Sequence, residues 1–149
     1  MQKEIQTLIL EHPELSQRRQ LLQTIPGIGE RTIPYLLGLL GDTSKFSDVK
    51  KLISFVGLAP RHHQSGSSVR GKSQIGRAGD STIRSALFMP AIAVGFGKYA
   101  KFSPFATRLE ANGKKRKAIV IALMRKLLSI AYAVIRNNEP FNPALHQMS

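Results

Sequence analysis

The 149-residue sequence contains no cysteine. Disulfide bonds and thiolate metal sites are therefore excluded, and the composition fits a reducing compartment. Carboxylates are scarce as well, because residues 51–149 hold three Asp and Glu against sixteen Lys and Arg. Two-metal phosphoryl transfer needs several converging carboxylates. We therefore expect neither a metal site nor a self-contained metal nuclease in this chain.

Long apolar runs are also missing from the sequence. The amino terminus, MQKEIQTLIL, lacks an apolar signal core, and a stretch such as ALFMPAIAVGFG is shorter than the roughly 18 residues that suggest a membrane span. We expect a cytoplasmic, nucleoid-associated protein with no membrane partner. With four histidines in all, of which His12 and His146 lie near the termini, a zinc site is not expected either.

The net charge of +13 is confined to one part of the chain. Residues 1–50 hold six basic and six acidic side chains, so residues 51–149 carry the whole excess. Lys and Arg that contact phosphates release counterions and supply most of the sequence-independent affinity for nucleic acid. The charge therefore predicts a polyanion as partner; an anionic membrane surface is the alternative, although no helix pairs a basic face with a clean apolar one.

Hydrophobic periodicity and helix signals predict a mainly α-helical single domain with a helix-hairpin-helix-like element and a small two-stranded β-ribbon. A helix over 44–54 would be capped by Ser44 or Ser47, and another would begin with Asp80 as N-cap and bend at Pro90. The ribbon would pair FVGLAP with VRGKSQIG around the tip RHHQSGSS. The other predicted helices span 2–10, 14–24, 30–41, 103–113 and 114–136, the last as the central core element.

Residues 15–40 read as helix, PGIG turn and helix, which resembles the helix-hairpin-helix motif. In that motif Gly27 and Gly29 would let the backbone approach a phosphate while amides at the start of the second helix point at the anion. The alternative is a plain helical turn that needs glycine for its backbone angles. Either way the element would bind backbone and carry no sequence preference.

Ser65 lies in a segment that is rich in basic residues. A serine hydroxyl that attacks a phosphodiester needs in-line positioning and positive charge around the phosphate oxygens. The alternative is that Ser65 forms a turn before Gly66. The basic residues that would surround it are Arg61, His62, His63, Arg70, Lys72, Arg77 and Arg84.

Two further basic positions are candidates for nucleic-acid contact. The first is the run Lys114, Lys115, Arg116 and Lys117 at the start of the last helix, which would contact phosphates or simply form a solvated face. The second is Arg125 beside Lys126, which interrupts an otherwise buried helix. These two side chains either extend to the surface or point into a polar cleft.

Residues 24–142 resemble the carboxy-terminal transposase domain of the insertion-sequence one-ten/one-sixteen family, the bridge-RNA-guided recombinases. The matching segments, in the order of the family, are IPGIGERTI, FVGLAPRHHQSG, GRAGDSTIRSALFMPA and NGKKRKAIVIALMRKLLSIAYAVI followed by EPFNP. The resemblance implies that Ser65 is the nucleophile, with Pro60 and Gly66 matching the segment around it.

The resemblance also implies parts that this sequence does not contain. Family members carry an amino-terminal domain like a Holliday-junction resolvase, whose Asp and Glu bind metal, and we expect Mg²⁺ there. They act as homo-multimers with a guide RNA. We expect residues 1–23 to be a remnant of the helical linker, 24–143 the serine-bearing DNA-binding domain and 144–149 a tail, with the isolated chain inactive. The alternatives are a non-catalytic DNA- or RNA-binding module and a multimerisation module.

Overall fold

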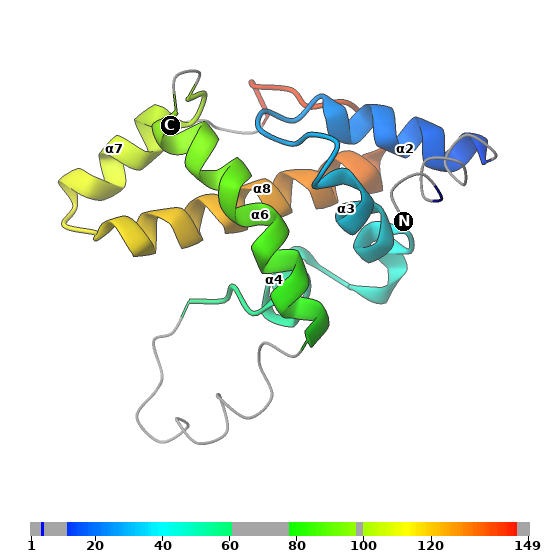
Figure 1. Cartoon of the computed structure of the whole chain (residues 1–149), viewed down its shortest axis with the longest axis horizontal. Helices are drawn as coiled ribbons and strands as arrows, with labels where there is room; N and C mark the ends of the chain where they lie inside the picture. The colour runs from blue at the N-terminus through cyan, green and yellow to red at the C-terminus, as the bar shows by residue number, and fades with distance from the viewer. Residues whose placement is uncertain (1–3, 5–11, 61–77, 98–99, 146–149) are drawn as a thin grey trace.

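The computed structural model describes residues 4, 12–60, 78–97 and 100–145. Within these ranges it contains six α-helices and one short 3₁₀ helix (Figure 1). The helices are α2 (Pro13–Gln23), α3 (Ile33–Leu40), α4 (Val49–Val56), α6 (Ala78–Phe96), α7 (Ser103–Ala111) and α8 (Arg116–Asn137), and η1 is Thr43–Lys45. The prediction of a mainly α-helical fold is confirmed.

Helix α8 forms the centre of the fold, as its nearly continuous apolar sequence predicts. It crosses α6 and also contacts α2, α3, α4, α7 and η1 (Figure 1). Its mean hydropathy of 2.0 over 18 residues is high enough, by length and composition, for a membrane span, contrary to the expectation that no stretch of the sequence reaches that length. Of that window 61% is buried inside the fold, and core burial alone can explain such a composition.

The ends of several helices follow from local sequence signals. Pro13 occupies the first turn of α2 and Pro34 that of α3, where a missing amide hydrogen costs nothing. Helix α3 begins two to three residues later than predicted, because the Gly29 carbonyl first accepts hydrogen bonds from the amides of Thr32 and Ile33, at 3.0 Å each. Helix α7 ends before Gly113 and α8 begins within two residues of its predicted start.

The predicted helix over 44–54 is divided in two, and its serine caps are wrong. The Asp42 carboxylate accepts from the Ser44 amide at the start of η1, and the Asp48 carboxylate accepts from the Lys51 amide at 3.0 Å at the start of α4. A carboxylate at the N-cap also interacts favourably with the positive end of the helix dipole. The two aspartates therefore take the positions assigned to Ser44 and Ser47.

The first strand of the predicted ribbon is wrong as well. Phe55 and Val56 complete α4 instead, since Leu52 and Val56 lie one helical turn apart and are both fully buried. Gly57 then ends the helix with φ at +84°, and the amides of Gly57 and Leu58 bond back to the carbonyls of Ser54 and Ile53, a Schellman motif. No strand occurs in the part of the chain that the structure describes; the second predicted strand, 69–76, lies outside it.

Helix α6 begins before the predicted cap. Asp80 is the third residue of the helix, so it is not the N-cap. Pro90 lies inside the helix, and its ring nitrogen cannot donate to the carbonyl of Ala86, four residues earlier. The buried Thr32 hydroxyl donates to that carbonyl at 3.2 Å. A residue from the α2–α3 turn thus satisfies the backbone group that Pro90 leaves without a partner.

Candidate nucleic-acid interface

The predicted nucleophile lies outside the described residues, together with most of the cations expected around it. This set comprises Ser65, Arg61, His62, His63, Arg70, Lys72 and Arg77. The described chain reaches Pro60 on one side of this segment and resumes with α6 on the other. The structure therefore describes the two helices that flank the segment, α4 and α6, and not the arrangement of the predicted site itself.

Arg84 and Arg125 bind the end of α4, directly before this segment. Arg84 Nη1 donates to the Val56 carbonyl at 2.8 Å, and Arg125 Nη1 donates to the Leu58 carbonyl at 3.0 Å. Carbonyls in the last turn of a helix have no partner within the helix, so a guanidinium from a neighbouring helix is a suitable donor. These contacts join α6 and α8 to the chain that leads to Pro60.

Burial lowers the pKa of the Arg125 guanidinium from its ordinary value. An arginine keeps its proton under these conditions. Arg125 therefore remains a cation whose bonded nitrogen faces a main-chain carbonyl. This hydrogen bond uses one nitrogen of the guanidinium, and contact of its other nitrogens with solvent or with a polar cleft stays a prediction.

We expect Arg84→Gln and Arg125→Gln each to lower the free energy of unfolding by about 1.5–3 kcal/mol, the usual contribution of a hydrogen bond made by a charged group. Urea denaturation measures the change. Lys51→Gln, an exposed substitution on α4, is the matched control and should stay within about 0.5 kcal/mol of wild type. Variants as stable as this control, but with weakened DNA binding, would show that the two arginines contact phosphate instead.

The two glycines of the predicted hairpin differ in their surroundings. Gly27 has φ at +82°, and a Cβ placed on it would lie 2.6 Å from Val94 Cγ1 and 3.1 Å from the Pro90 carbonyl oxygen. A Cβ on Gly29 would have no neighbour within 4 Å. Gly27 therefore lets the turn pack closely against α6, whereas Gly29 leaves open space.

A carboxylate also lies at this turn. Glu30 accepts hydrogen bonds from the side chains of Arg19 and Gln23, and the Arg19 contact is an ion pair. The hydrogen bond from Arg19 is the main reason that the pKa of Glu30 is lowered. Helix α2 and the end of the turn are thus joined by an exposed charge pair, and phosphate binding by Gly27 and Gly29 stays a prediction.

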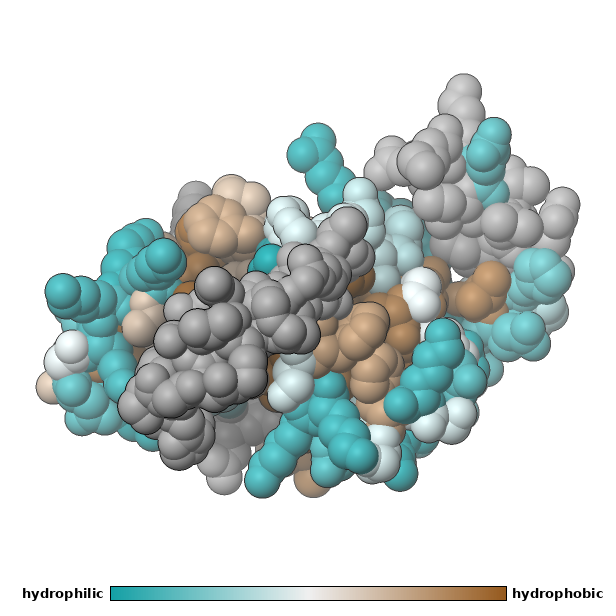
Figure 2. Space-filling model, turned by 90° about the horizontal axis from the view of Figure 1, so that it is seen from below, coloured by the Kyte–Doolittle hydropathy of each residue, from teal (hydrophilic) through white to brown (hydrophobic). Residues whose placement is uncertain are grey.

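The hairpin formed by α7 and α8 carries the basic run at its tip. Residues 111–118 are all exposed, and Figure 2 shows hydrophilic side chains gathered at the end of the molecule where this hairpin lies, on the left in both views. Arg116 lies over the Phe96 ring at 4.1 Å, which anchors it to the end of α6. In the described ranges the one ion pair is Arg19–Glu30, so the charges of this tip are not neutralised by carboxylates.

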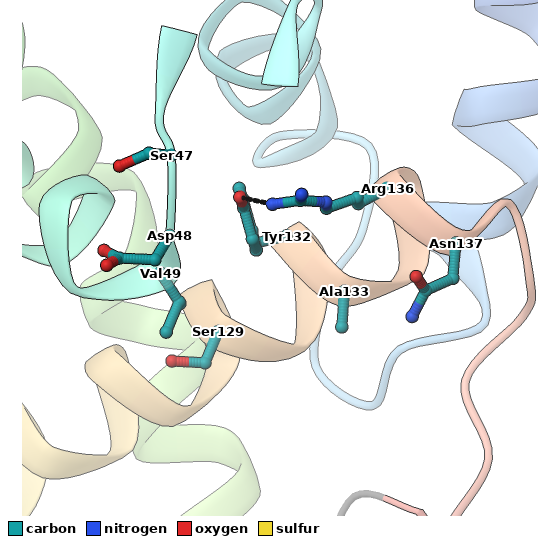
Figure 3. Close-up of a pocket in the computed structure, with 8 residues that line it drawn as sticks. All are labelled: Ser47, Asp48, Val49, Ser129, Tyr132, Ala133, Arg136 and Asn137. Atoms are coloured by element: carbon teal, nitrogen blue, oxygen red, sulfur yellow. Dashed lines mark hydrogen bonds between the residues drawn. The ribbon is translucent and has the colours of Figure 1, made fainter. Parts of the chain in front are cut away.

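A groove beside the second half of α8 offers no comparable set of charges (Figure 3). Its two charged side chains already have partners, because Asp48 caps α4 and Arg136 donates to the Tyr132 hydroxyl. Tyr132 in turn donates to the Phe46 carbonyl at 3.0 Å. No three His, Asp or Glu side chains come together in the described ranges. The residues present there do not form a metal site.

Comparison with known proteins places the chain among mobile-element proteins. A family model described as Transposase IS116/IS110/IS902 family matches residues 19–104. The pilin gene-inverting proteins of Moraxella lacunata and Moraxella bovis are each 56% identical over 135 residues, which cover 91% of this chain and 42% of theirs. The insertion element IS110 uncharacterized 43.6 kDa protein of Streptomyces coelicolor is 31% identical over 137 residues, covering 92% of this chain and 32% of its own. The chain thus spans well under half the length of these relatives.

Proposed function

This chain belongs to the transposase IS116/IS110/IS902 family of mobile elements, and from that premise we propose that it is the serine-bearing domain of a DNA recombinase. The observation that carries the proposal is the extent of the family match, which runs from residue 19 to residue 104 and so includes Ser65 and the basic residues around it. The excess charge of residues 51–149 supports DNA as the substrate.

In the proposed reaction the Ser65 hydroxyl oxygen attacks a DNA phosphorus. The serine proton leaves, a P–Oγ bond forms and the bond from phosphorus to one sugar oxygen breaks, with that oxygen taking a proton. One phosphate ester replaces another, so no oxidant and no nucleotide is consumed. Arg61 and Arg70 would balance the charge that develops on the phosphate oxygens.

The proposal includes three partners that lie outside this chain. Mg²⁺ would be held by carboxylates of another domain, because no three His, Asp or Glu side chains come together among the described residues of this chain. A guide RNA and further copies of the protein would complete the assembly, as the family resemblance implies. The nucleoid would be the place of action, because DNA is the proposed substrate.

Trapping of the covalent intermediate tests the proposal. The full-length protein is incubated with DNA and Mg²⁺, quenched in denaturant and digested, and the peptides that carry nucleotide are identified by mass spectrometry. We expect the adduct on the peptide that contains Ser65. Adducts on another residue, or recombination with no adduct, would instead support a non-catalytic nucleic-acid-binding or multimerisation domain.

A site-specific DNA inversion is a second candidate reaction. It is favoured by the 56% identity to two proteins named for inverting a pilin gene. A DNA segment flanked by inverted sites, cloned between primers that report orientation, distinguishes the two reactions. Inversion without loss of the segment supports the invertase reading, whereas excision and insertion elsewhere support transposition.

We expect replacement of Lys114, Lys115, Arg116 and Lys117 by Ala to flatten the salt dependence of duplex DNA binding. Each lost phosphate contact lowers the slope of log K against log salt by about 0.9. Binding is measured by fluorescence anisotropy between 50 and 200 mM salt, with the melting temperature checked because Arg116 also packs on Phe96. A slope equal to that of wild type would remove this helix start from the interface.

A further inference from the structure

Lys126 and Arg108 converge on one aromatic ring at the base of the α7–α8 hairpin. The Lys126 ammonium lies 4.7 Å from the centre of the Phe105 ring and 5.6 Å from that of Phe102. The Arg108 guanidinium lies 5.4 Å from the centre of the same Phe105 ring. Two cations from different helices are thus attracted to the same Phe105 ring.

Neither cation has a negatively charged partner in the part of the chain that the structure describes. Lys126 makes no hydrogen bond and neither side chain forms an ion pair within the described residues, so the three donors of the ammonium are unused. Burial lowers the pKa of Lys126, and the charge of Arg108 adds to that effect. Both causes act against the charged amine, and an anion that accepts from both groups would counter them.

We propose that Lys126 and Arg108 form a phosphate-binding site for the backbone of a nucleic acid. Lys126 supplies a compact ammonium and Arg108 a planar guanidinium, the two groups that bind phosphate oxygens in proteins. The site rests on the proposed nucleic-acid function of the domain, but not on Ser65 as nucleophile. It adds two residues that the basic run at the helix start does not include.

The position of the pair along the hairpin fits a continuous strand. Eleven residues, about three helical turns, separate Lys115 at the N-cap of α8 from Lys126, so the two lie on the same face of the helix, about 16 Å apart along its axis. One strand of duplex DNA advances about 3.4 Å per phosphate, so roughly five phosphates span that length. A single strand that lies along the hairpin can therefore contact both the tip and the Lys126–Arg108 pair.

The surroundings favour nucleic acid over a lipid surface. Large exposed apolar side chains of the described residues lie on α3, α4, α6 and near the carboxyl end, at Tyr35, Phe55, Phe88, Met89 and Leu145. None of them lies on α7 or α8. A peripheral membrane site needs apolar side chains beside the cations to enter the lipid, and this hairpin presents charge without them.

Charge-neutralising variants of the domain test the site against duplex DNA and against an RNA hairpin. Lys126→Met keeps the contact with the phenyl rings but removes the charge. The Arg108 side chain is exposed, so Arg108→Gln removes a charge and leaves the core intact. Lys126→Arg keeps the charge. Lys45→Met, on η1, is the matched control. We expect each neutralising variant to lower the salt slope on DNA by about 0.9, which makes the affinity change between 50 and 200 mM salt three- to fourfold smaller. Lys126→Arg and Lys45→Met should match wild type.

Each result has a defined meaning. Unchanged slopes for Arg108→Gln and Lys126→Met, while the four substitutions at 114–117 flatten the slope, would overturn this site and leave the proposed function standing. If DNA and RNA binding by the wild-type domain shows no salt dependence, both this site and the proposed function are overturned. A loss confined to RNA would assign the site to the guide RNA, and a loss confined to DNA to the recombining strands. If Arg108→Gln and Lys126→Met both lose binding to phosphatidylserine vesicles but keep nucleic-acid binding, the pair is a membrane site and the proposal is overturned.

Discussion

We expect Ser65→Ala, in the full-length protein, to abolish the covalent protein–DNA product while leaving DNA affinity within a few fold of wild type. Alanine removes the oxygen that would bond to phosphorus and leaves every cation of the segment in place. Electrostatic binding by Lys and Arg should therefore persist, whereas the chemical step cannot start. Covalent product is measured on denaturing gels with labelled DNA, and affinity by anisotropy.

Ser67 and Ser68 serve as internal controls for this prediction. Both lie in the same segment and share the turn preference of serine. If Ser65 is the nucleophile, only its substitution should abolish the covalent product. If the serines stabilise a turn, substitution of Ser65, Ser67 or Ser68 should have comparable effects. Full recombination by Ser65→Ala, with no adduct trapped from wild type, would sink the catalytic proposal and leave a nucleic-acid-binding domain.

The basic residues near Ser65 should divide by role. We expect Arg61→Gln and Arg70→Gln to slow adduct formation more than they weaken affinity, because charge builds up on the phosphate oxygens in the transition state. Arg84 belongs to a different class, since it already donates to the Val56 carbonyl. Its substitution should affect stability first.

The largest effect on stability is expected at Gly27. Gly27→Ala must adopt a left-handed backbone, which costs about 1–2 kcal/mol, and must fit a Cβ 2.6 Å from Val94 Cγ1, where overpacking costs about 1–3 kcal/mol. We expect the free energy of unfolding to fall by about 2–5 kcal/mol in total. Urea denaturation with a far-UV signal, which reports helix content, measures it.

Gly29→Ala is the matched control, and it also separates the two roles considered for the turn. A Cβ there meets no atom within 4 Å, so stability should change by less than about 0.5 kcal/mol. If Gly29 also lets the backbone approach phosphate, Gly29→Ala will weaken DNA binding per folded molecule without lowering stability. Unchanged affinity would leave the turn purely architectural, and a neutral Gly27→Ala would contradict the close packing on α6.

Much of the fold could be predicted from the sequence because its signals are local. Prolines that suit only a first turn begin α2 and α3, Gly113 ends α7, and the apolar run of α8 identifies the central helix. The predictions failed where two local signals competed. Asp48 took the cap position assigned to serine, and the β-forming residues Phe55 and Val56 joined a helix, since burial of one helical face exceeded their intrinsic preference.

The sequence by itself determined a basic, mainly helical domain and carried the motifs of its transposase family, because charge, periodicity and motif order need no tertiary contact. Only the tertiary structure decided what individual residues do. Arg84 and Arg125 bind carbonyls 28 and 67 positions away, and Lys126 and Arg108, from two different helices, pack on the same Phe105 ring. The sequence gives the same Arg or Lys whether the side chain contacts phosphate or the protein backbone. The partner of each side chain depends on packing between segments that are far apart in the chain.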